Sequence, residues 1–160
     1  MYFNDMPFIT YSLDNETQQI VRDITLRVKI SDHLKEAAYA YEKYIIQDGD
    51  RPETVAAKIY KNPELHWVIM IANDIVDPYE DWPMSSADLD EYIEALGDGE
   101  DIDHYENADG YWVNPNFPGA TPVTIREYRT KVNDEKRVIK IPKPELINFV
   151  ISEYTRLMKV

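Results

Sequence analysis

The sequence contains no cysteine, and it has far fewer basic than acidic residues. Without cysteine, the chain can form no disulfide scaffold, no thiolate metal site and no cysteine nucleophile. Its 17 lysines and arginines stand against 30 aspartates and glutamates, which leaves a formal net charge of -13 at pH 7. Because phosphate groups repel such a surface, we expect neither nucleic acid nor an anionic membrane surface as a partner.

Long hydrophobic runs are also missing from the sequence. No apolar run reaches the roughly 18 residues that a membrane-spanning helix requires. Residues 1–6 show neither the basic region nor the apolar stretch of a signal peptide. We therefore expect a protein that is made and kept in a cytoplasm-like compartment. Hydrophobic residues still make up 44% of the 160 residues, which is enough for one domain or a small core with appended arms.

No combination of residues in the sequence suggests an active site or a metal site. The three histidines, His33, His66 and His104, are far apart, and none has a second histidine four positions later. The acidic run Asp98–Asp109 does not place glycine and glutamate where a calcium loop needs them. The five glycines form no phosphate-binding loop. We therefore predict a protein that is not an enzyme and that has no catalytic residues, no cofactor and no metal.

Hydrophobic periodicity predicts an α+β fold. Near the N-terminus, Phe8–Tyr11 is a short apolar run, and apolar residues alternate with polar ones over 24–30, which is the period of a half-buried strand. Residues 14–15 are a plausible turn, and a short helix is expected over 35–39. Further along, the expected elements are strands at 44–47 and 137–141, helices at 52–60, 63–72, 87–96, 124–133 and 144–158, a hairpin at 104–113 and an extended loop at 114–122.

Proline marks the start of the two middle helices. Pro52 suits a first helical position, because its missing N–H would have no partner inside the helix there. Asn62 caps a second helix whose first residue is Pro63. Residues 65–72 are apolar almost all round, with only His66 interrupting, so we expect this helix to be buried on most sides.

The large aromatic residues are candidates for either core or interface positions. Trp67, Trp82 and Trp112 could each anchor a partner, stack on a sugar or fill the core. Trp67 lies within the buried helix and is predicted as a core residue, whereas Trp82 follows a loop with proline and leaves core and interface equally open. The terminal helix has a broad apolar face that includes Phe149 and Tyr154. That face is wider than a lone surface helix needs, which indicates burial on two sides.

The segment Tyr44–Tyr60 resembles the start of a LysM module, in which a strand, a glycine-aspartate turn and a capped helix follow one another. The second helix and the exit at residues 73–75 match the usual end of that module. The resemblance implies a βααβ unit at residues 41–85. It divides the chain into an arm at 1–40 with β structure and a short helix, the module at 41–85, and a segment at 86–160 with a helix, a hairpin, a loop and a terminal amphipathic helix.

A longer resemblance covers about residues 8–158. Arg51-Pro52-Glu53, Asn62–Val68, and Asp77-Pro78-Tyr79 with Trp82 are similar to motifs of the LysM-bearing baseplate wedge subunit of contractile-tailed, T-even-like bacteriophages, as are His104–Gly110 and Asn133–Arg137. The resemblance implies a structural protein of the virion tail baseplate, assembled in the host cytoplasm, that joins neighbouring wedge proteins. It implies contacts with other wedge proteins and with sheath-initiator-like tail proteins, and multiple copies in a symmetric assembly.

A glycan-binding module is the alternative function, because many LysM modules bind polymers of N-acetylglucosamine, as in peptidoglycan. In that family two turns form the sugar groove, and they correspond here to Asp48–Pro52 and Ile75–Pro78. Their charges neither favour nor exclude a sugar, but the charged flanks and the missing secretion signal argue against cell-wall binding. The candidate residues for an interface or for this groove are Asp48, Arg51, Pro52, Asp77, Pro78, Tyr79, Trp82, Phe149 and Tyr154.

Overall fold

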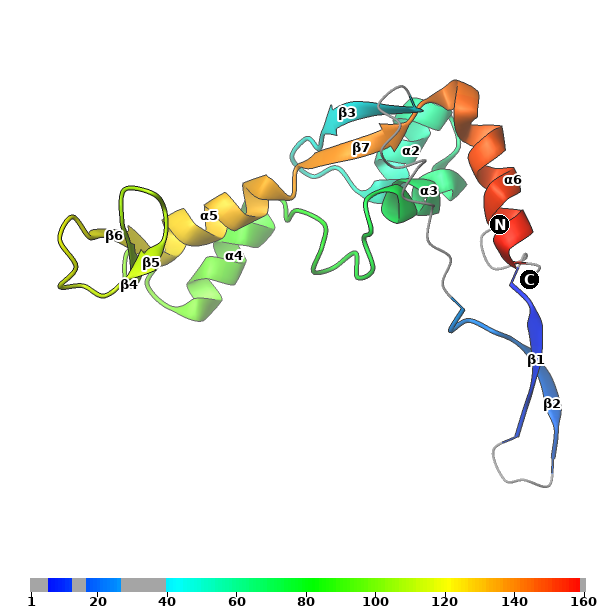
Figure 1. Cartoon of the computed structure of the whole chain (residues 1–160), viewed down its shortest axis with the longest axis horizontal. Helices are drawn as coiled ribbons and strands as arrows, with labels where there is room; N and C mark the ends of the chain where they lie inside the picture. The colour runs from blue at the N-terminus through cyan, green and yellow to red at the C-terminus, as the bar shows by residue number, and fades with distance from the viewer. Residues whose placement is uncertain (1–5, 13–16, 27–39, 159–160) are drawn as a thin grey trace. The chain divides into compact units, whose positions relative to one another are not determined.

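The computed structural model describes residues 6–12, 17–26 and 40–158, which are drawn in colour in Figure 1. In this part of the chain, helices accompany short strands that pair into small sheets, so the predicted α+β class is confirmed. The chain divides into two compact units. Unit 1 consists of Met1–Tyr44, Arg51–Pro78 and Ile139–Val160, and unit 2 consists of Ile45–Asp50 and Tyr79–Val138. Each unit is thus built from separate stretches of sequence, while the predicted segments 1–40, 41–85 and 86–160 stay a prediction.

Unit 1 begins with a two-stranded hairpin. Strand β1, Phe8–Tyr11, pairs antiparallel with strand β2, Gln19–Arg22, which confirms the first predicted strand. The strand expected over 24–30 is wrong in its described part, because residues 24 and 25 form a turn. Asp23 causes that turn: its Oδ1 accepts hydrogen bonds from Thr25 N at 3.0 Å and Thr25 Oγ1 at 2.6 Å, which competes with strand pairing. The turn at 14–15 and the helix at 35–39 lie outside the described residues.

Both middle helices of unit 1 form as predicted. Helix α2 spans Pro52–Tyr60 with proline at its first position. A 3-10 turn, η3 at Pro63–Leu65, leads into helix α3 at His66–Ala72, and the Asn62 side chain accepts a hydrogen bond from Glu64 N at 3.0 Å. The inward side chains of the two helices are fully buried against one another. They are Val55, Ala56, Val68 and Ile69.

The strand that pairs with β3 (Tyr41–Ile45) comes from outside the predicted module at 41–85. Strand β3 pairs with β7, Val138–Pro142, and the two run in opposite directions (Figure 1). No strand follows α3 within residues 73–85, all of which are described. Asn73 explains why β7 takes this place. Its Oδ1 accepts from Lys140 N at 2.8 Å and its Nδ2 donates to Lys140 O at 2.7 Å, so α3 ends on the backbone of β7.

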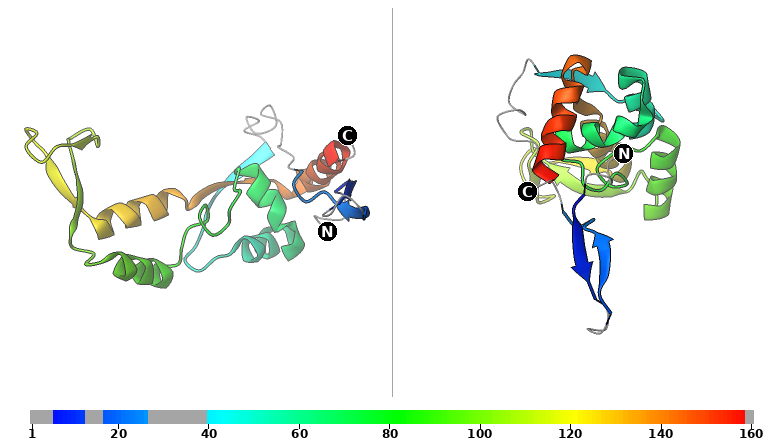
Figure 2. Two further views of the ribbon diagram at one scale, coloured as in Figure 1. Left: turned by 90° about the horizontal axis from the view of Figure 1, so that it is seen from below. Right: turned by 90° about the vertical axis from the view of Figure 1, so that its right-hand side faces the viewer.

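The last predicted helix is confirmed as a 3-10 turn, η4 at Pro144–Leu146, followed by α6 at Ile147–Met158. Its inner face packs on α3, where the rings of Trp67 and Tyr154 lie 4.5 Å apart between centroids. Figure 2 shows α6 beside the middle helices. The core cluster consists of Met6, Trp67, Val68, Tyr154 and Met158. The prediction of Trp67 as a core residue is therefore confirmed.

Unit 2 contains two helices and a three-stranded sheet. Helix α4, Ser86–Leu96, lies beside α5, Ile125–Glu135, in Figures 1 and 2. Strand β4, Ile102–Glu106, pairs with β5, Trp112–Val113, which confirms the predicted hairpin, and on its other side with β6, Thr121–Thr124. The extended loop expected over 114–122 is wrong at its end, because residues 121 and 122 belong to β6. Pro122 is tolerated there because β6 is an edge strand.

Polar side chains hold the connection before α4 in place. Asn133 on α5 is buried, and it accepts from Met84 N at 2.8 Å and donates to Met84 O at 3.1 Å. Trp82 is buried in the same unit, and its Nε1 donates to Asp50 O at 2.7 Å. The question that the sequence left open for Trp82 is thus decided in favour of packing inside unit 2.

Candidate interaction surfaces

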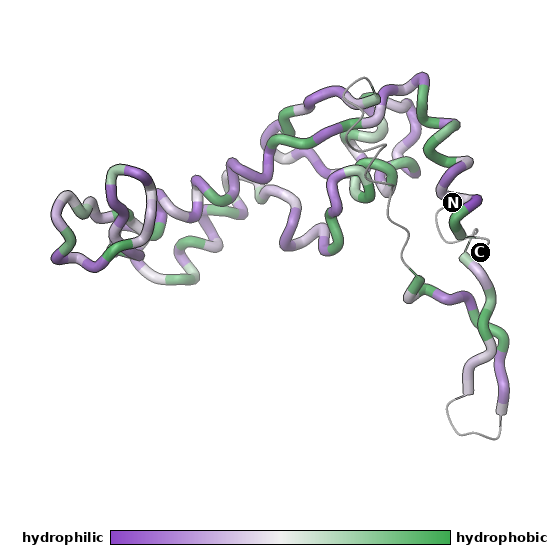
Figure 3. Tube along the Cα trace, viewed as in Figure 1, coloured by the Kyte–Doolittle hydropathy of each residue, from purple (hydrophilic) through white to green (hydrophobic). Residues whose placement is uncertain are grey.

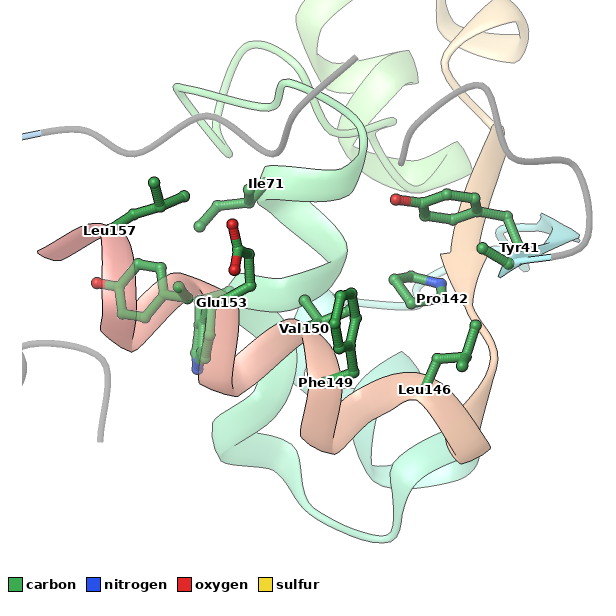
Figure 4. Close-up of a pocket in the computed structure, with 11 residues that line it drawn as sticks. Tyr41, Ile71, Pro142, Leu146, Phe149, Val150, Glu153 and Leu157 are labelled. Atoms are coloured by element: carbon green, nitrogen blue, oxygen red, sulfur yellow. The ribbon is translucent and has the colours of Figure 1, made fainter. Parts of the chain in front are cut away.

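An apolar groove follows α6 in unit 1. Figure 4 shows Phe149, Val150 and Leu157 of α6 on one side, with Ile71 of α3 and Pro142 of β7 opposite. The enclosed part of the groove measures only about 30 Å³. A space of that size holds about one water, and its apolar walls offer such a water few partners. The groove is therefore narrow, and its outer rim is an apolar strip open to solvent.

Two features mark the rim of this groove. Phe149 is 52% exposed, although it is one of the larger apolar side chains of the helix. Glu153 lies at the edge, where Arg156 donates to it from Nε at 2.9 Å and from Nη2 at 2.6 Å. The hydrogen bond to Arg156 lowers the pKa of Glu153. The predicted interface residue Phe149 therefore lies on the surface, whereas its neighbour Tyr154 is buried beneath the helix.

The N-terminal hairpin exposes apolar side chains on both of its faces. The register pairs Phe8 with Arg22 and Ile9 with Val21, so successive residues of each strand alternate between the faces. One face carries Phe8 and Ile20, and the other carries Ile9 and Tyr11. All four of these apolar side chains are exposed, and Ile20 reaches 77%. Figure 3 shows hydrophobic residues along both strands.

The residues predicted for a sugar-type groove are divided between the two units. Arg51, Asp77 and Pro78 are exposed in unit 1, where Pro52 is buried at the start of α2. Asp48 belongs to unit 2, together with Tyr79, which is exposed, and Trp82, which is buried. The buried side chains offer little surface to a partner. For the exposed ones, a role in binding stays a prediction.

Asp48 has a local structural task within unit 2. Its Oδ1 accepts from Ser86 N at 2.8 Å and lies 3.5 Å from Arg137 Nη2. The hydrogen bonds from Ser86, with the nearby Arg137 charge, lower the pKa of the Asp48 carboxyl. The carboxylate thus fastens the first residue of α4 to the turn that carries Asp48.

The sequence reasoning missed a cluster around His104 in unit 2. His104 is only 8% exposed, its Nδ1 lies 2.8 Å from Asp103 Oδ2, and its Nε2 lies 3.1 Å from Glu106 Oε1. Burial by itself lowers the pKa of His104, but the hydrogen bonds and charges of Glu106 and Asp103 outweigh it and raise the pKa above its usual value. The usable signal was the spacing, because residues 104 and 106 share one face of a strand.

Trp112 covers this histidine from outside. The two rings are stacked with centroids 4.0 Å apart and planes 14° apart. Tyr128 of α5 meets His104 edge-on at 5.0 Å and Trp112 edge-on at 5.7 Å. Trp112 nevertheless remains 62% exposed. It therefore covers the buried histidine with one face while most of its own surface is open.

The described ranges 6–12, 17–26 and 40–158 contain neither a metal-binding cluster nor a membrane-spanning helix. Over these residues, no group of three or more histidine, cysteine, aspartate or glutamate side chains is placed to hold a metal ion. Over the same ranges, no helix has both the length and the apolar character needed to cross a membrane.

Comparison with known proteins identifies the family of the chain. The family model described as base plate wedge protein 53 matches residues 2–117 of the chain. The chain belongs to this family. A curated relative, "Baseplate wedge protein gp53" of Enterobacteria phage T4, is 30% identical in an alignment that covers 77% of this chain and 76% of the relative. The resemblance to the baseplate wedge subunit is thus confirmed.

Membership of the base plate wedge protein 53 family decides the coarse role of the chain. It is a structural component of a contractile phage tail baseplate, and its location is the tail of the virion. The matched residues include the N-terminal hairpin, α2, α3, α4 and the β4–β5 hairpin. They also include the His104 cluster, which is therefore part of the family region rather than of an appended tail.

Proposed function

We propose that this chain joins neighbouring wedge proteins during assembly of the tail baseplate, and that it acts as a structural protein without catalysis. The observation that carries the proposal is the β1–β2 hairpin with its two exposed apolar faces. Its partners are other wedge proteins and sheath-initiator-like tail proteins, and it is present in multiple copies in the symmetric assembly. Membership of the family supports this role.

The physical argument starts from the marginal stability of such a hairpin. A two-stranded ribbon in water is marginally stable at best, and it needs further strands or a packed face to persist. No further strand pairs with β1 or β2 among the described residues. Burying each exposed Phe or Ile side chain in a partner would contribute roughly 1.5–3 kcal/mol. An adjoining protein is the natural source of that burial.

The edges of the hairpin support the same conclusion. Exposed edge strands are normally protected by lysine, proline or bulges, because their unpaired backbone groups invite pairing with other chains. Strands β1 and β2 contain no lysine, proline or bulge, and Arg22 is their one charged residue. The Arg22 guanidinium carbon lies 4.5 Å from the centre of the Phe8 ring, so the charge is placed over a face rather than along an edge. The hairpin can therefore add to a partner's sheet through main-chain hydrogen bonds.

The test places one charge on the hairpin. The full chain with Ile20→Asp is mixed with each purified wedge protein of the same phage and followed by sedimentation velocity. We expect the affinity to fall about tenfold or more, because the new carboxylate would be buried without a partner charge in the interface, which is strongly disfavoured. Val76→Asp is the matched control, since Val76 is also an exposed aliphatic residue of unit 1 outside the hairpin.

Two results would count against this function. The first is a parent chain that sediments alone with every wedge protein. The second is saturable binding of the parent chain to purified peptidoglycan that is lost in Asp77→Ala, because this would favour the LysM-type glycan module.

A further inference from the structure

The charge of the chain is concentrated in one of its two units. Unit 2 contains seventeen aspartates and glutamates against five lysines and arginines, a net charge of -12, whereas unit 1 contains thirteen against twelve. No lysine or arginine occurs between Lys61 and Arg126. Unit 2 therefore presents a strongly negative surface while unit 1 is close to neutral. A field of one sign attracts partners of the opposite sign and speeds their encounter.

An exposed aromatic group lies within this negative unit. These side chains belong to the sheet β5-β4-β6 and the loops that join its strands, which together we call the tip surface. Its exposed large side chains are Ile102, Tyr111, Trp112 and Phe117. A shallow depression beside Trp112 is lined by Ile102, Asn114 and Pro115, among others. Aromatic side chains in such a setting are the usual anchors of protein interfaces.

Packing within unit 2 fixes the Trp112 side chain before any partner binds. Its inner face stacks on His104, and Tyr128 meets its edge. His104 is fixed in turn by Asp103 and Glu106, and Lys131 Nζ lies 3.5 Å from the Glu106 carboxylate. A side chain that is already fixed loses little conformational entropy on binding. With one face covered and 62% of its surface exposed, Trp112 presents its other face outward.

We propose that the tip surface of unit 2 docks on a lysine- and arginine-rich protein surface of a neighbouring baseplate component, with Trp112 as its anchor. The open face of an indole attracts a lysine or arginine side chain by a cation–π interaction. The exposed carboxylate of Asp109, in the turn that joins β4 to β5, pairs with a further basic side chain. This inference rests on the proposed joining role and specifies the chemistry of one partner.

The net charge of unit 2 also argues against other partners at the tip surface. A second copy of unit 2 would bring two surfaces of net charge -12 together. Like charges across an interface cost several kcal/mol, so self-association through the tip surface is disfavoured. Nucleic acid is repelled for the same reason. A purely apolar partner would leave the carboxylates around Trp112 desolvated without partners.

The test measures binding of the full chain to each purified wedge protein of the same phage at 50 mM and 300 mM NaCl. We expect one partner to bind about tenfold or more weakly at the higher salt concentration, because salt screens charge attraction. Trp112→Ala should weaken this binding about tenfold or more. Asp109→Lys should weaken it about threefold or more at 50 mM NaCl, mainly through slower association.

Two control variants and one fold check make the result specific. Tyr79→Ala removes an aromatic side chain of unit 2 that is 88% exposed and lies outside the tip surface. Glu64→Lys makes the same charge change in unit 1. Both controls should bind within about twofold of the parent chain. Asp109→Lys changes an exposed turn residue, so it tests the tip surface even if Trp112→Ala disturbs the His104 cluster.

The possible outcomes separate this inference from the joining role. Binding that is insensitive to salt would overturn the inference and leave the joining role intact. The same holds if the tip variants Trp112→Ala and Asp109→Lys bind like the parent chain while Ile20→Asp binds more weakly. Self-association of the parent chain that Asp109→Lys changes would also overturn it. If no wedge protein binds the parent chain, both proposals fail.

Discussion

Units 1 and 2 are stabilised in different ways. Of the fifteen buried hydrophobic residues among the described ones, twelve belong to unit 1 and three to unit 2. Both buried polar residues, His104 and Asn133, belong to unit 2. Unit 1 is therefore held mainly by apolar packing around Trp67, and unit 2 mainly by directed polar contacts and stacked rings. The two units of one chain thus use their side chains in different ways.

The difference extends to the surfaces. Unit 1 exposes apolar residues on the hairpin and along α6 while carrying almost no net charge. Unit 2 carries nearly all of the negative charge together with Trp112. Apolar surface favours permanent contacts, and charge favours rapid, selective encounter. The two units are thus suited to two kinds of contact in an assembly.

The strongest test of this comparison removes the centre of the unit 1 core. Trp67→Ala should lower the free energy of unfolding by roughly 3–5 kcal/mol, because it deletes a large buried ring and its contact with Tyr154. Urea denaturation of the purified chain measures the effect. Tyr79→Ala, on the surface of unit 2, should change stability by no more than about 0.5 kcal/mol. A loss below about 1 kcal/mol for Trp67→Ala would show that unit 1 does not depend on this core.

A smaller effect is expected from the polar counterpart in unit 2. Asn133→Ala removes both hydrogen bonds to the Met84 backbone and should cost about 1–3 kcal/mol. Hydrogen exchange at the Met84 amide should accelerate, which localises the effect. Asn73→Ala in unit 1 is the matched variant, and its loss should be smaller, because water can reach its bonds to Lys140. Equal losses would remove the contrast between the two units.

The smallest expected effect is a dependence of unit 2 on pH. The raised pKa of His104 means that the folded chain holds this proton more tightly than the unfolded chain. The stability that the protonated His104 contributes is therefore fully present below pH 6.5, the ordinary pKa, and is lost as the pH rises through the raised pKa of the folded chain. The lowered pKa of Glu106 acts in the opposite direction. The stability that the ionised Glu106 contributes is fully present above pH 4.5 and is lost as the pH falls through the lowered pKa of the folded chain.

We therefore expect unit 2 to be most stable between about pH 4.5 and 6.5, where both contributions are present. Thermal melts across this range measure the effect, and an NMR titration of the His104 ring measures its pKa. In His104→Gln, the loss of stability on the alkaline side should disappear. An unchanged pH profile in that variant would assign the dependence to other groups.

Local signals predicted most of the secondary structure. The prolines at 52 and 63 and the cap at Asn62 act within one turn of the helix that they start, so their effect can be read from neighbouring residues. The strand expected over 24–30 failed in its described part for a reason that is also local. Asp23 there offers the backbone hydrogen bonds that end the pairing.

The sequence did not show which of the candidate site residues are buried. Phe149 is exposed, whereas Pro52, Trp82 and Tyr154 are buried within their units, and the role of these residues in binding stays a prediction. Burial depends on what packs against a residue, and that neighbour can lie far along the chain. Trp112 illustrates the reverse case, because a tryptophan that could equally have filled the core covers a histidine and remains largely exposed.

The sequence by itself determined the α+β class, the starts of most helices, the absence of cysteine chemistry and membership of the wedge protein family, because these depend on composition and on short-range patterns. Tertiary structure alone decided that β7 rather than a nearer segment pairs with β3 and that His104 lies between two carboxylates under Trp112. These features depend on which distant residues meet in space, and that outcome is set by the sum of many weak contacts rather than by any local pattern.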